Sequence, residues 1–465
     1  MSIPIENYKK KAKAKRHSKV FIKDIDTYTK RLKENNLPII FSITHLSKCL
    51  NIKPSELLSI AEYGNFFDVK NKTVLYNYQI KKSKKWLESI KLYLTSLNKK
   101  YNPFYKKRKE ANDQLLIDDI LNEIQPFENI NEEKSNASLL DNSFKENAPF
   151  ENEEDFYYDD INEYNVINSN YKFFKIKKKN GGHREIMAPK GQLKNIQRWI
   201  NFYILNQIEI HPNCFGFIKN RSIKNNAKIH INQECILNID LLKFFDTITQ
   251  ERVFGMFKQF GYHPNLARLL ASLTTAKHKE WFWNQIDLNK HPELKKLVEK
   301  KPKIIPQGAP TSPSISNIIC RRLDNRLNKL ALKCNCKYSR YADDITFSGR
   351  KSDLPTLKLI NKIIREEGFF TNTDKIGFYS KGSKQYVTGL AINDGVRIPR
   401  KRKREIRQIL HYCKINGVEN HKKNTGIENK KQFKEWLAGN IAFIHDIEPR
   451  KAKKLWDKFN DLEWE

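Results

Sequence analysis

Alternation of apolar and polar residues with a period of two predicts several short β-strands in this chain. Residues 171–189 alternate, turn at Asn180-Gly181-Gly182 and alternate again, which predicts a β-hairpin with a basic tip. Residues 337–349, with the sequence KYSRYADDITFSG, alternate on both sides of Ala342-Asp343-Asp344 and predict a second hairpin. Further strands are predicted for the apolar run Cys235–Ile239 and, as a pair, for residues 375–379 and 386–392.

Apolar residues at helical spacing predict helices in the segments between these strands. Residues 39–61 indicate a small helical unit in which Pro54 and Ser55 begin a second helix. Longer helical patterns follow at residues 192–207, about 251–276 and 354–367, and in the basic last segment to Glu465. The lysine-rich residues 277–303 lack such a pattern and predict irregular structure.

The composition changes sharply within the first third of the chain. Residues 1–112 are basic, and the aromatic rings of residues 70–112 suit either stacking on single-stranded bases or packing in a helical core. Residues 113–165 are acidic, and residues 151–163 contain seven Asp or Glu but no Lys or Arg. Low hydrophobicity predicts that this acidic segment is a partly disordered linker or insert.

The net charge indicates a polyanionic partner. The 465 residues include 86 Lys and Arg against 53 Asp and Glu, a formal net charge of +33. Nucleic acid is favoured over a membrane, because no amphipathic or lipidated segment is evident. No apolar run approaches membrane-spanning length and no signal-peptide core follows the basic start, so we expect a cytoplasmic protein without a membrane partner. Seven scattered cysteines fit a reducing compartment.

Three aspartates are the candidate catalytic residues. Asp343 and Asp344 are neighbours at the tip of the second predicted hairpin, where a divalent cation such as Mg²⁺ would relieve their repulsion. For this pair alone, a solvated Asp-Asp turn is the simpler alternative. The strand that ends at Asp240 adds a third carboxylate, and three aspartates from two strands favour a two-metal phosphoryl-transfer site.

Two loops are candidates for nucleotide binding. Lys178 and Arg184 lie near the tip of the first hairpin, where their charges suit a triphosphate, although a solvated turn is the alternative. In the loop around Pro306, Gly308 permits a close approach of backbone, which would turn Gln307 towards a bound nucleotide or template.

In this order the blocks resemble a bacterial reverse transcriptase over about residues 171–409. The matching blocks are the basic hairpin, Asp240 with Phe244-Phe245-Asp246, Pro306-Gln307-Gly308, Tyr341-Ala342-Asp343-Asp344, Asn372 and Lys375. Two more elements resemble those that mark retron reverse transcriptases: Asn226 to His230 matches NAxxH, and Val387-Thr388-Gly389 matches VTG. The chain departs from the family at residues 64–165, which separate the helical start from the finger hairpin.

The resemblance implies an α+β fold of the right-hand polymerase type. Its fingers would occupy residues 166–235, its palm residues 236–392 and its basic helical thumb residues 393–465. A basic helical N-terminal extension at residues 1–112 and the acidic segment at 113–165 would precede them.

The resemblance also implies roles for individual residues. Asp240, Asp343 and Asp344 would hold two Mg²⁺ ions, and Lys375 would protonate the leaving pyrophosphate, unless it is a structural lysine on the thumb side. Phe245 would pack beneath the incoming sugar and exclude a 2′-hydroxyl. RNA would be bound by the two retron elements and the basic start of the thumb, namely Asn226, His230, Val387, Thr388, Gly389, Arg400, Lys401, Arg402 and Lys403.

The implied function is RNA-directed DNA polymerisation on a cognate structured non-coding RNA. Deoxynucleoside triphosphates would be the substrates, and priming from an internal 2′-hydroxyl would leave a branched RNA–DNA product. Retron systems pair this product with an effector or toxin protein against phage, so such a partner is expected. Two alternatives stay open: a defence-associated reverse transcriptase that is protein-primed or untemplated, and a non-catalytic RNA-binding scaffold.

Overall fold

The computed structural model of this chain describes residues 30–40, 43–61, 170–177, 183–425 and 430–464. The chain divides into two compact units. One unit comprises Met1–Glu209 and Phe245–Ile319, and the other comprises Ile210–Phe244 and Cys320–Glu465. The division into extension, linker, fingers, palm and thumb stays a prediction.

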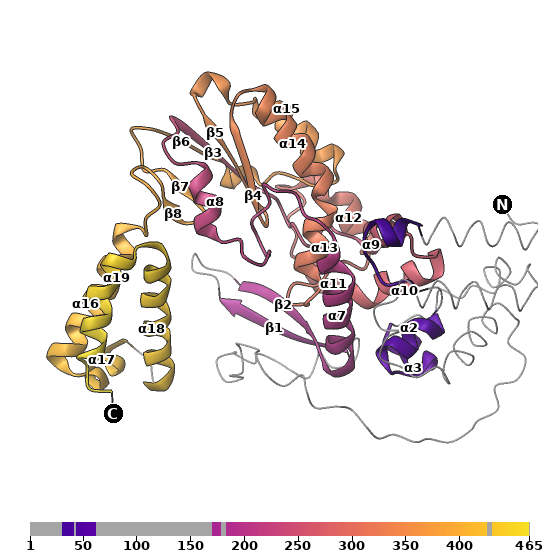
Figure 1. Cartoon of the computed structure of the whole chain (residues 1–465), viewed down its shortest axis with the longest axis horizontal. Coiled ribbons are helices and arrows are strands. Elements are labelled where there is room, and N and C mark those ends of the chain that lie inside the picture. Colours follow the sequence, from indigo (N-terminus) through magenta and orange to yellow (C-terminus); the bar gives the residue numbers. More distant parts are fainter. Residues whose placement is uncertain (1–29, 41–42, 62–169, 178–182, 426–429, 465) are drawn as a thin grey trace, which may run out of the picture. The chain divides into compact units, whose positions relative to one another are not determined.

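A four-stranded antiparallel sheet lies at the centre of the second unit (Figure 1). Its strand order is β4 (Lys337–Tyr341), β5 (Asp344–Gly349), β3 (Cys235–Asp240) and β6 (Gly377–Ser380). The predicted hairpin of β4 and β5 and the predicted strand β3 are therefore confirmed. Because β6 pairs with β3, the predicted pairing of β6 with residues 386–392 is wrong.

One face of this sheet is covered by helices. Tyr338 and Phe347 lie on this face with their ring centroids 5.3 Å apart, because alternate residues of a strand point to the same side. The helix α14 (Arg321–Lys333) packs on β4, and α15 (Leu357–Glu366) packs on α14. The sheet and its two helices enclose a core in which Ile345 and Phe347 have no exposed surface.

The other face of the hairpin carries small polar residues. Ser339 and Ser348 are buried there, and their hydroxyls lie 2.7 Å from the two ring nitrogens of His230. His230 directly follows α8 (Ile223–Ile229), so α8 is tied to β4 and β5 through one imidazole ring.

A short hairpin of β7 (Tyr386–Val387) and β8 (Leu390–Ala391) follows the sheet. Its turn residues, Thr388 and Gly389, both have positive φ, 46° and 78°. Positive φ at both central positions is typical of the type I′ turn, which joins twisted strands through only two residues. The segment expected as one strand is thus a tight hairpin.

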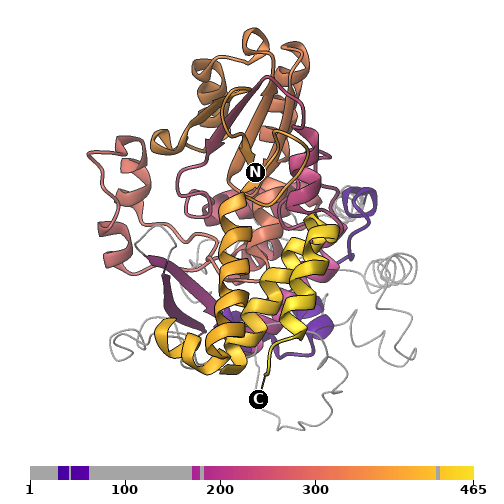
Figure 2. The same ribbon diagram turned by 90° about the vertical axis from the view of Figure 1, so that its left-hand side faces the viewer.

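Four helices end the second unit: α16 (Arg400–Asn416), α17 (Val418–Thr425), α18 (Lys430–Ile447) and α19 (Pro449–Asn460). They lie side by side in Figures 1 and 2. Their buried side chains form one hydrophobic cluster with residues of β3 and β7, including Ile236, Val387, Leu410, Phe433, Leu437 and Ile441. The basic helices predicted for the last segment are confirmed.

The first unit combines the other predicted hairpin with helices. The strands β1 (Tyr171–Lys177) and β2 (His183–Pro189) pair antiparallel, as predicted. The longer helices are α7 (Gly191–Tyr203), α9 (Gln250–Phe260), α10 (Pro264–Thr274) and α13 (Ser312–Ile319). A short element, η7 (Leu205–Gln207), follows α7. Residues 277–303, which were expected to be irregular, contain the short helices α11 (Glu280–Asn284), η8 (Pro292–Leu294) and α12 (Lys295–Lys300).

The helical stretch expected over residues 251–276 is interrupted. Gly261 ends α9 with φ of 107°, a left-handed conformation that favours glycine, and Pro264 begins α10. Glycine followed by proline therefore turns one predicted helix into two.

The described N-terminal part begins with helical residues 30–34 and continues with α2 (Ile43–Leu50) and α3 (Pro54–Ile60), with Pro54 at the predicted start of α3. It is tied to later residues of the first unit by hydrogen bonds from the Ser272 hydroxyl to the Ala61 carbonyl (2.8 Å) and from the Tyr262 hydroxyl to the Pro38 carbonyl (3.2 Å). The acidic segment and most of the basic extension lie outside the described residues. Among the described residues, no helix has the length and apolar character needed to cross a membrane.

Candidate active site

Two strands bring the predicted aspartates to one edge of the central sheet. Asp240 is the last residue of β3, and its partner in the antiparallel register is Asp344, the first residue of β5. Asp343 lies in the turn just before, and its carbonyl accepts a hydrogen bond of 3.0 Å from the Leu241 amide. The register therefore places Asp240 next to Asp343 and Asp344, which are more than 100 residues later in the sequence.

Asp240 is held by two side chains from the segment after α15. The Asn372 side-chain amide donates to Oδ2 at 3.0 Å, and the Lys375 ammonium lies 3.0 Å from Oδ1 and 3.2 Å from Oδ2. Lys375 is the last residue of the turn η10 (Thr373–Lys375). The predicted proton donor thus contacts a predicted metal ligand, although its catalytic role stays a prediction.

The Asp344 carboxyl has a raised pKa. Removal of water from the carboxylate, together with the charges of Asp343 and Asp240, raises the pKa of Asp344 to about 7. Lys375 opposes this shift, and the residue still has an exposed edge. A carboxyl that holds its proton near neutral pH marks a site where negative charge lacks a sufficient counter-charge.

The composition of this site fits divalent magnesium. The candidate ligand atoms are carboxylate oxygens, which Mg²⁺ prefers. Desolvation is the main cause of the raised pKa of Asp344, and the negative charges of Asp343 and Asp240, which add to it, are charges that a cation would balance. In the described part of the chain, no three acidic, His or Cys side chains are already arranged as a metal centre, and Lys375 supplies positive charge beside Asp240.

The two phenylalanines after Asp240 differ in environment. Phe244 is buried, with its ring centroid 5.6 Å from that of Phe369. Phe245 is only half-buried, and its carbonyl accepts a hydrogen bond of 3.1 Å from the Ile248 amide. The contact of Phe245 with an incoming sugar stays a prediction.

The candidate nucleotide-binding residues belong to the first unit. Arg184 is exposed on β2, whereas Lys178 lies outside the described residues. The Gln307 carbonyl accepts a hydrogen bond of 2.7 Å from the Met187 amide, and Gly308 has φ of 112°. A Cβ on Gly308 would lie 2.6 Å from the Ile186 side chain, so glycine is required for this loop to pack on β2. Their roles towards a nucleotide stay predictions.

The NAxxH residues are buried. Asn226 is 1% exposed and His230 is 0% exposed. Burial, aided by the charge of Lys337, lowers the pKa of His230 to about 3, so the ring is neutral at physiological pH. Burial of both side chains argues against direct contact with RNA in this conformation, and their RNA-binding role stays a prediction. His230 instead joins α8 to the aspartate hairpin.

The VTG residues are only partly accessible. Val387 is buried in the helical cluster, Thr388 is half-buried and Gly389 is exposed. The type I′ turn explains the glycine without any ligand. Burial of Val387 makes the Thr388-Gly389 turn the more accessible part of this element, and RNA binding by the three residues stays a prediction.

The basic run at the start of α16 divides into exposed and packed residues, since successive helical residues point about 100° apart. Arg400 and Lys401 are exposed. Arg402 donates to Asn440 Oδ1 at 2.7 Å, and Lys403, with 12% of its side chain exposed, lies 2.6 Å from Glu448. The ammonium of Lys403 is thus paired within the helical bundle, and RNA binding by this residue stays a prediction.

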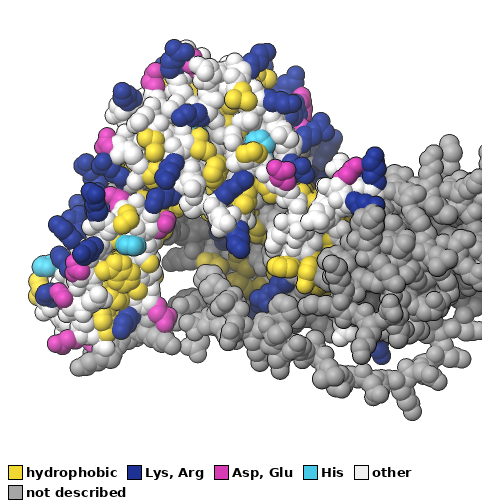
Figure 3. Space-filling view, in the orientation of Figure 1, with side chains coloured by type: hydrophobic (Ala, Val, Ile, Leu, Met, Phe, Trp, Pro, Cys, Tyr) yellow, Lys and Arg dark blue, Asp and Glu magenta, His cyan; other side chains and the backbone are white. Residues whose placement is uncertain are grey.

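Exposed basic residues nevertheless gather in this region. Figure 3 shows Lys and Arg side chains clustered on the visible face over β6 to β8 and the start of α16. A cavity of about 420 Å³ opens here, lined by Thr388, Gly389, Pro399, Lys401, Arg402, Glu405 and Phe443. This surface retains Arg400, Lys401 and the Thr388-Gly389 turn as RNA-binding candidates.

Aspartates at the ends of adjacent antiparallel strands are the arrangement expected of a nucleic acid polymerase of the right-hand class. Residues 176–417 match the family described as reverse transcriptase (RNA-dependent DNA polymerase). This match covers more than half of the chain, and the protein belongs to the reverse transcriptase family. The predicted fold class is thereby confirmed. Reverse transcriptases generally use divalent metal ions.

Curated relatives confirm the resemblance to retron enzymes. The retron Mx162 reverse transcriptase of Myxococcus xanthus is 33% identical over 313 residues, 63% of this chain and 61% of that protein. The retron Ec86 reverse transcriptase of Escherichia coli is 30% identical over 63% of this chain and 81% of that protein. The retron Ec73 reverse transcriptase of Escherichia coli is 32% identical over 63% of this chain and 88% of that protein. The chain spans 61% of the length of the retron Mx162 enzyme and 63% of that of the retron Mx65 enzyme, which is also from Myxococcus xanthus.

A solved telomerase from Candida albicans is similar over 62% of this chain and 59% of that chain. Its sequence identity is 13% and its TM-score is 0.30, so this similarity carries no argument.

Sequence reasoning missed one pair beside the aspartates, Arg340 and Asp324. Both side chains are fully buried and form an ion pair. A signal was present for Asp324, which lies three residues before Leu327 on the buried side of an amphipathic helix. A charged residue among apolar positions of a helix requires a partner in the core.

Proposed function

We propose that this protein is an RNA-directed DNA polymerase of a retron. The observation that carries the proposal is the pairing of Asp240 with Asp344 at the ends of β3 and β5, with Asp343 in the turn that joins β4 to β5. A polymerase of this class needs carboxylates from separate strands at one point, because two neighbouring metal ions must stabilise the attacking and the leaving oxygen of one in-line displacement.

The three aspartates would hold two Mg²⁺ ions, which when bound supply a lower pKa for the primer hydroxyl and neutralise charge on the leaving pyrophosphate. Asn372 fixes the orientation of the Asp240 carboxylate through its 3.0 Å hydrogen bond. Lys375 Nζ lies 3.0 Å from the same carboxylate, and this residue would donate a proton to the leaving group. Phe245 would occupy the space of a 2′-hydroxyl and so select deoxynucleotides.

The nucleic acid partner would be a cognate structured non-coding RNA. The exposed Arg400 and Lys401 and the Thr388-Gly389 turn form the surface proposed to bind it. Lys178 and Arg184 would bind the triphosphate, and Gln307 and Gly308 would line the nucleotide site. Support comes from the retron relatives and from the net charge of +33.

The finer steps are proposed on the same basis. The enzyme would prime from an internal 2′-hydroxyl of its RNA, leave a branched RNA–DNA product and act with an effector protein in defence against phage. These steps rest on the similarity to retron reverse transcriptases and not on a feature of the described residues.

Sequencing the nucleic acid that co-purifies with the full chain tests this function. We expect one enriched structured RNA joined to DNA, from which a 2′,5′-debranching enzyme releases the DNA strand. DNA that stays attached to protein, or DNA without an enriched RNA, would favour the protein-primed or untemplated alternative. Absence of any synthesis with deoxynucleotides and Mg²⁺ would favour a scaffold.

A further inference from the structure

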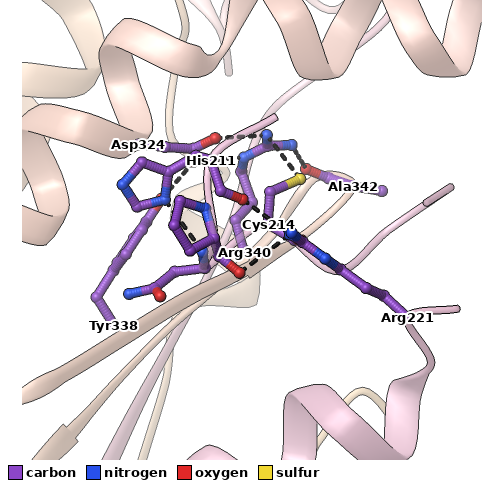
Figure 4. A network of polar contacts seen from close by, with 9 residues as sticks. His211, Cys214, Arg221, Asp324, Tyr338, Arg340 and Ala342 are labelled. Atoms are coloured by element: carbon purple, nitrogen blue, oxygen red, sulfur yellow. Dashed lines mark hydrogen bonds and ion pairs between the residues drawn. The ribbon is translucent and has the colours of Figure 1, made fainter. Parts of the chain in front are cut away.

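Arg340, in the strand β4, is fully buried although a guanidinium is costly to remove from water. Its partner is Asp324 on α14. Arg340 Nε donates to Asp324 Oδ1 and Nη2 donates to Oδ2, each at 2.7 Å, and both side chains have 0% exposure (Figure 4). Two parallel hydrogen bonds between a planar guanidinium and a carboxylate give this pair a fixed geometry.

The guanidinium also reaches the turn that carries the aspartates. Its Nη1 donates at 2.9 Å to the carbonyl of Ala342, which belongs to the peptide group that joins Ala342 to Asp343. Ala342 has φ of 57°, a left-handed conformation that alanine does not favour by itself. One buried side chain therefore connects α14 to the backbone immediately before the first turn aspartate.

A loop braces the same turn from a second direction. The Phe215 amide donates to the Arg340 carbonyl, and the Arg340 amide donates to the Asn213 carbonyl, both at 2.8 Å. A Cβ on Gly216 would lie 2.5 Å from the Ala342 nitrogen, so the loop backbone touches the turn. Arg221 holds this loop by donating to the His211 and Pro212 carbonyls at 2.9 and 3.0 Å.

We propose that Arg340 and Asp324 are positioning residues for DNA synthesis. The ion pair anchors the guanidinium to α14, and the guanidinium holds the Ala342–Asp343 peptide group, so that Asp343 and Asp344 keep one orientation towards Asp240. The inference rests on the proposed polymerase function. In this role the buried pair controls the orientation of the metal-binding aspartates. A pair with a purely structural role would affect only the stability of the fold.

Tyr338 provides a matched control within the same network. Its hydroxyl donates to Asp324 Oδ1 at 2.7 Å, and its side chain is also buried. This hydrogen bond reaches Asp324 and not the backbone of the Ala342–Asp343 turn. Tyr338→Phe removes one buried hydrogen bond from Asp324 and leaves the bond from Arg340 to Ala342 in place. Arg340→Lys keeps the charge but loses the planar fork that serves Asp324 and Ala342 at once.

The test compares both variants of the full chain in primer extension over a Mg²⁺ titration, with RNA binding and thermal unfolding measured in parallel. For Arg340→Lys we expect kcat to fall by about 10² and the Mg²⁺ concentration for half-maximal activity to rise several-fold, since small displacements of reacting groups carry such effects. RNA affinity should change less than about twofold. Tyr338→Phe should lower Tm while kcat and the Mg²⁺ midpoint stay within about twofold.

The inference is overturned if folded Arg340→Lys keeps wild-type kcat and Mg²⁺ dependence, or if Tyr338→Phe reproduces its kinetic defect. If Arg340→Lys does not fold, Gly216→Ala displaces the same turn without touching the ion pair. Wild-type kinetics in folded Gly216→Ala would also overturn the inference, and a raised Mg²⁺ midpoint would support it. Failure of the proposed function itself would appear differently, as a wild-type protein that makes no DNA.

Discussion

The aspartate hairpin and the start of α16 both collect charged residues, but they do so by opposite means. In the sheet, Asp240 and Asp344 are distant in sequence and become direct partners across two strands. In the helix, Arg400 to Lys403 are consecutive in sequence and separate into exposed and packed side chains. Strand pairing concentrates charge at one point, whereas a helix distributes it around an axis.

This difference teaches that adjacency in sequence is a poor guide to a shared role. Lys403 bonds Glu448 within the helical bundle, whereas Lys401, two residues earlier, faces solvent beside a cavity. At the hairpin, by contrast, the buried neighbour Arg340 is committed to the turn itself. The comparison predicts that chemistry depends on the hairpin and RNA affinity on the exposed half of α16.

The largest expected effect comes from removing the carboxylates of the hairpin. Asp343→Ala together with Asp344→Ala should reduce DNA synthesis by at least about 10³, because metal ligands act in the transition state. RNA affinity should stay within about twofold, since phosphate contacts come from other residues. Primer extension and filter binding measure the two quantities, with the exposed Asp374→Ala as the acidic control. A parallel loss of RNA affinity would break the comparison.

Phe244 and Phe245 are a second pair of sequence neighbours that we expect to have different roles. Phe245→Val should raise ribonucleotide incorporation by about 10- to 100-fold, or ~1.4 to 3 kcal/mol in discrimination, by opening space for a 2′-hydroxyl. Single-nucleotide extension with matched ribo- and deoxynucleotides measures this ratio. Phe244→Leu removes a ring buried against Phe369 and should lower Tm without changing sugar selectivity. The reverse outcome would show that Phe244 lines the sugar site.

The α16 side of the comparison is tested by salt dependence. Arg400→Ala with Lys401→Ala should reduce the slope of log K against log salt by about 1.4 to 1.8, or 0.7 to 0.9 for each lost phosphate contact. Lys403→Ala should leave the slope unchanged and lower Tm, because it removes one of the two ammonium groups at 2.6 Å from Glu448 and leaves only that of Lys451. If alanine substitutions of Lys403 and Lys401 change the slope equally, the burial of Lys403 does not keep it from contacting phosphate.

The smallest effect concerns His230. Its pKa is lowered to about 3 by burial and by Lys337, so the folded state binds fewer protons than the unfolded state between that value and about 6.5. Stability should therefore fall as pH drops below about 6.5, by ~1 to 2 kcal/mol between pH 7 and pH 5. Urea unfolding at the two pH values, compared with His230→Asn, measures this contribution. If the two proteins lose equal stability, His230 is not the titrating group.

Much of the active site could be predicted because its signals are local. The alternation around Asp343 and Asp344 and the apolar run before Asp240 reveal strands that end in carboxylates, and strand ends are set by residues close in sequence. The β7–β8 turn was missed as a hairpin, since Thr388-Gly389 is a weaker turn signal than Asn-Gly. The ion pair of Arg340 and Asp324 was missed because neither residue reveals its partner.

The sequence by itself determined the order of the reverse transcriptase blocks, the strands and helices that carry them, and the identity of the three aspartates, because hydrophobic period and turn residues act over short distances. Tertiary structure alone decided which charged residues are buried. It placed His230 between Ser339 and Ser348, and it paired Lys403 with Glu448 within the helical bundle. Burial and pairing depend on what packs against a residue from elsewhere in the chain, and no local pattern encodes that neighbour.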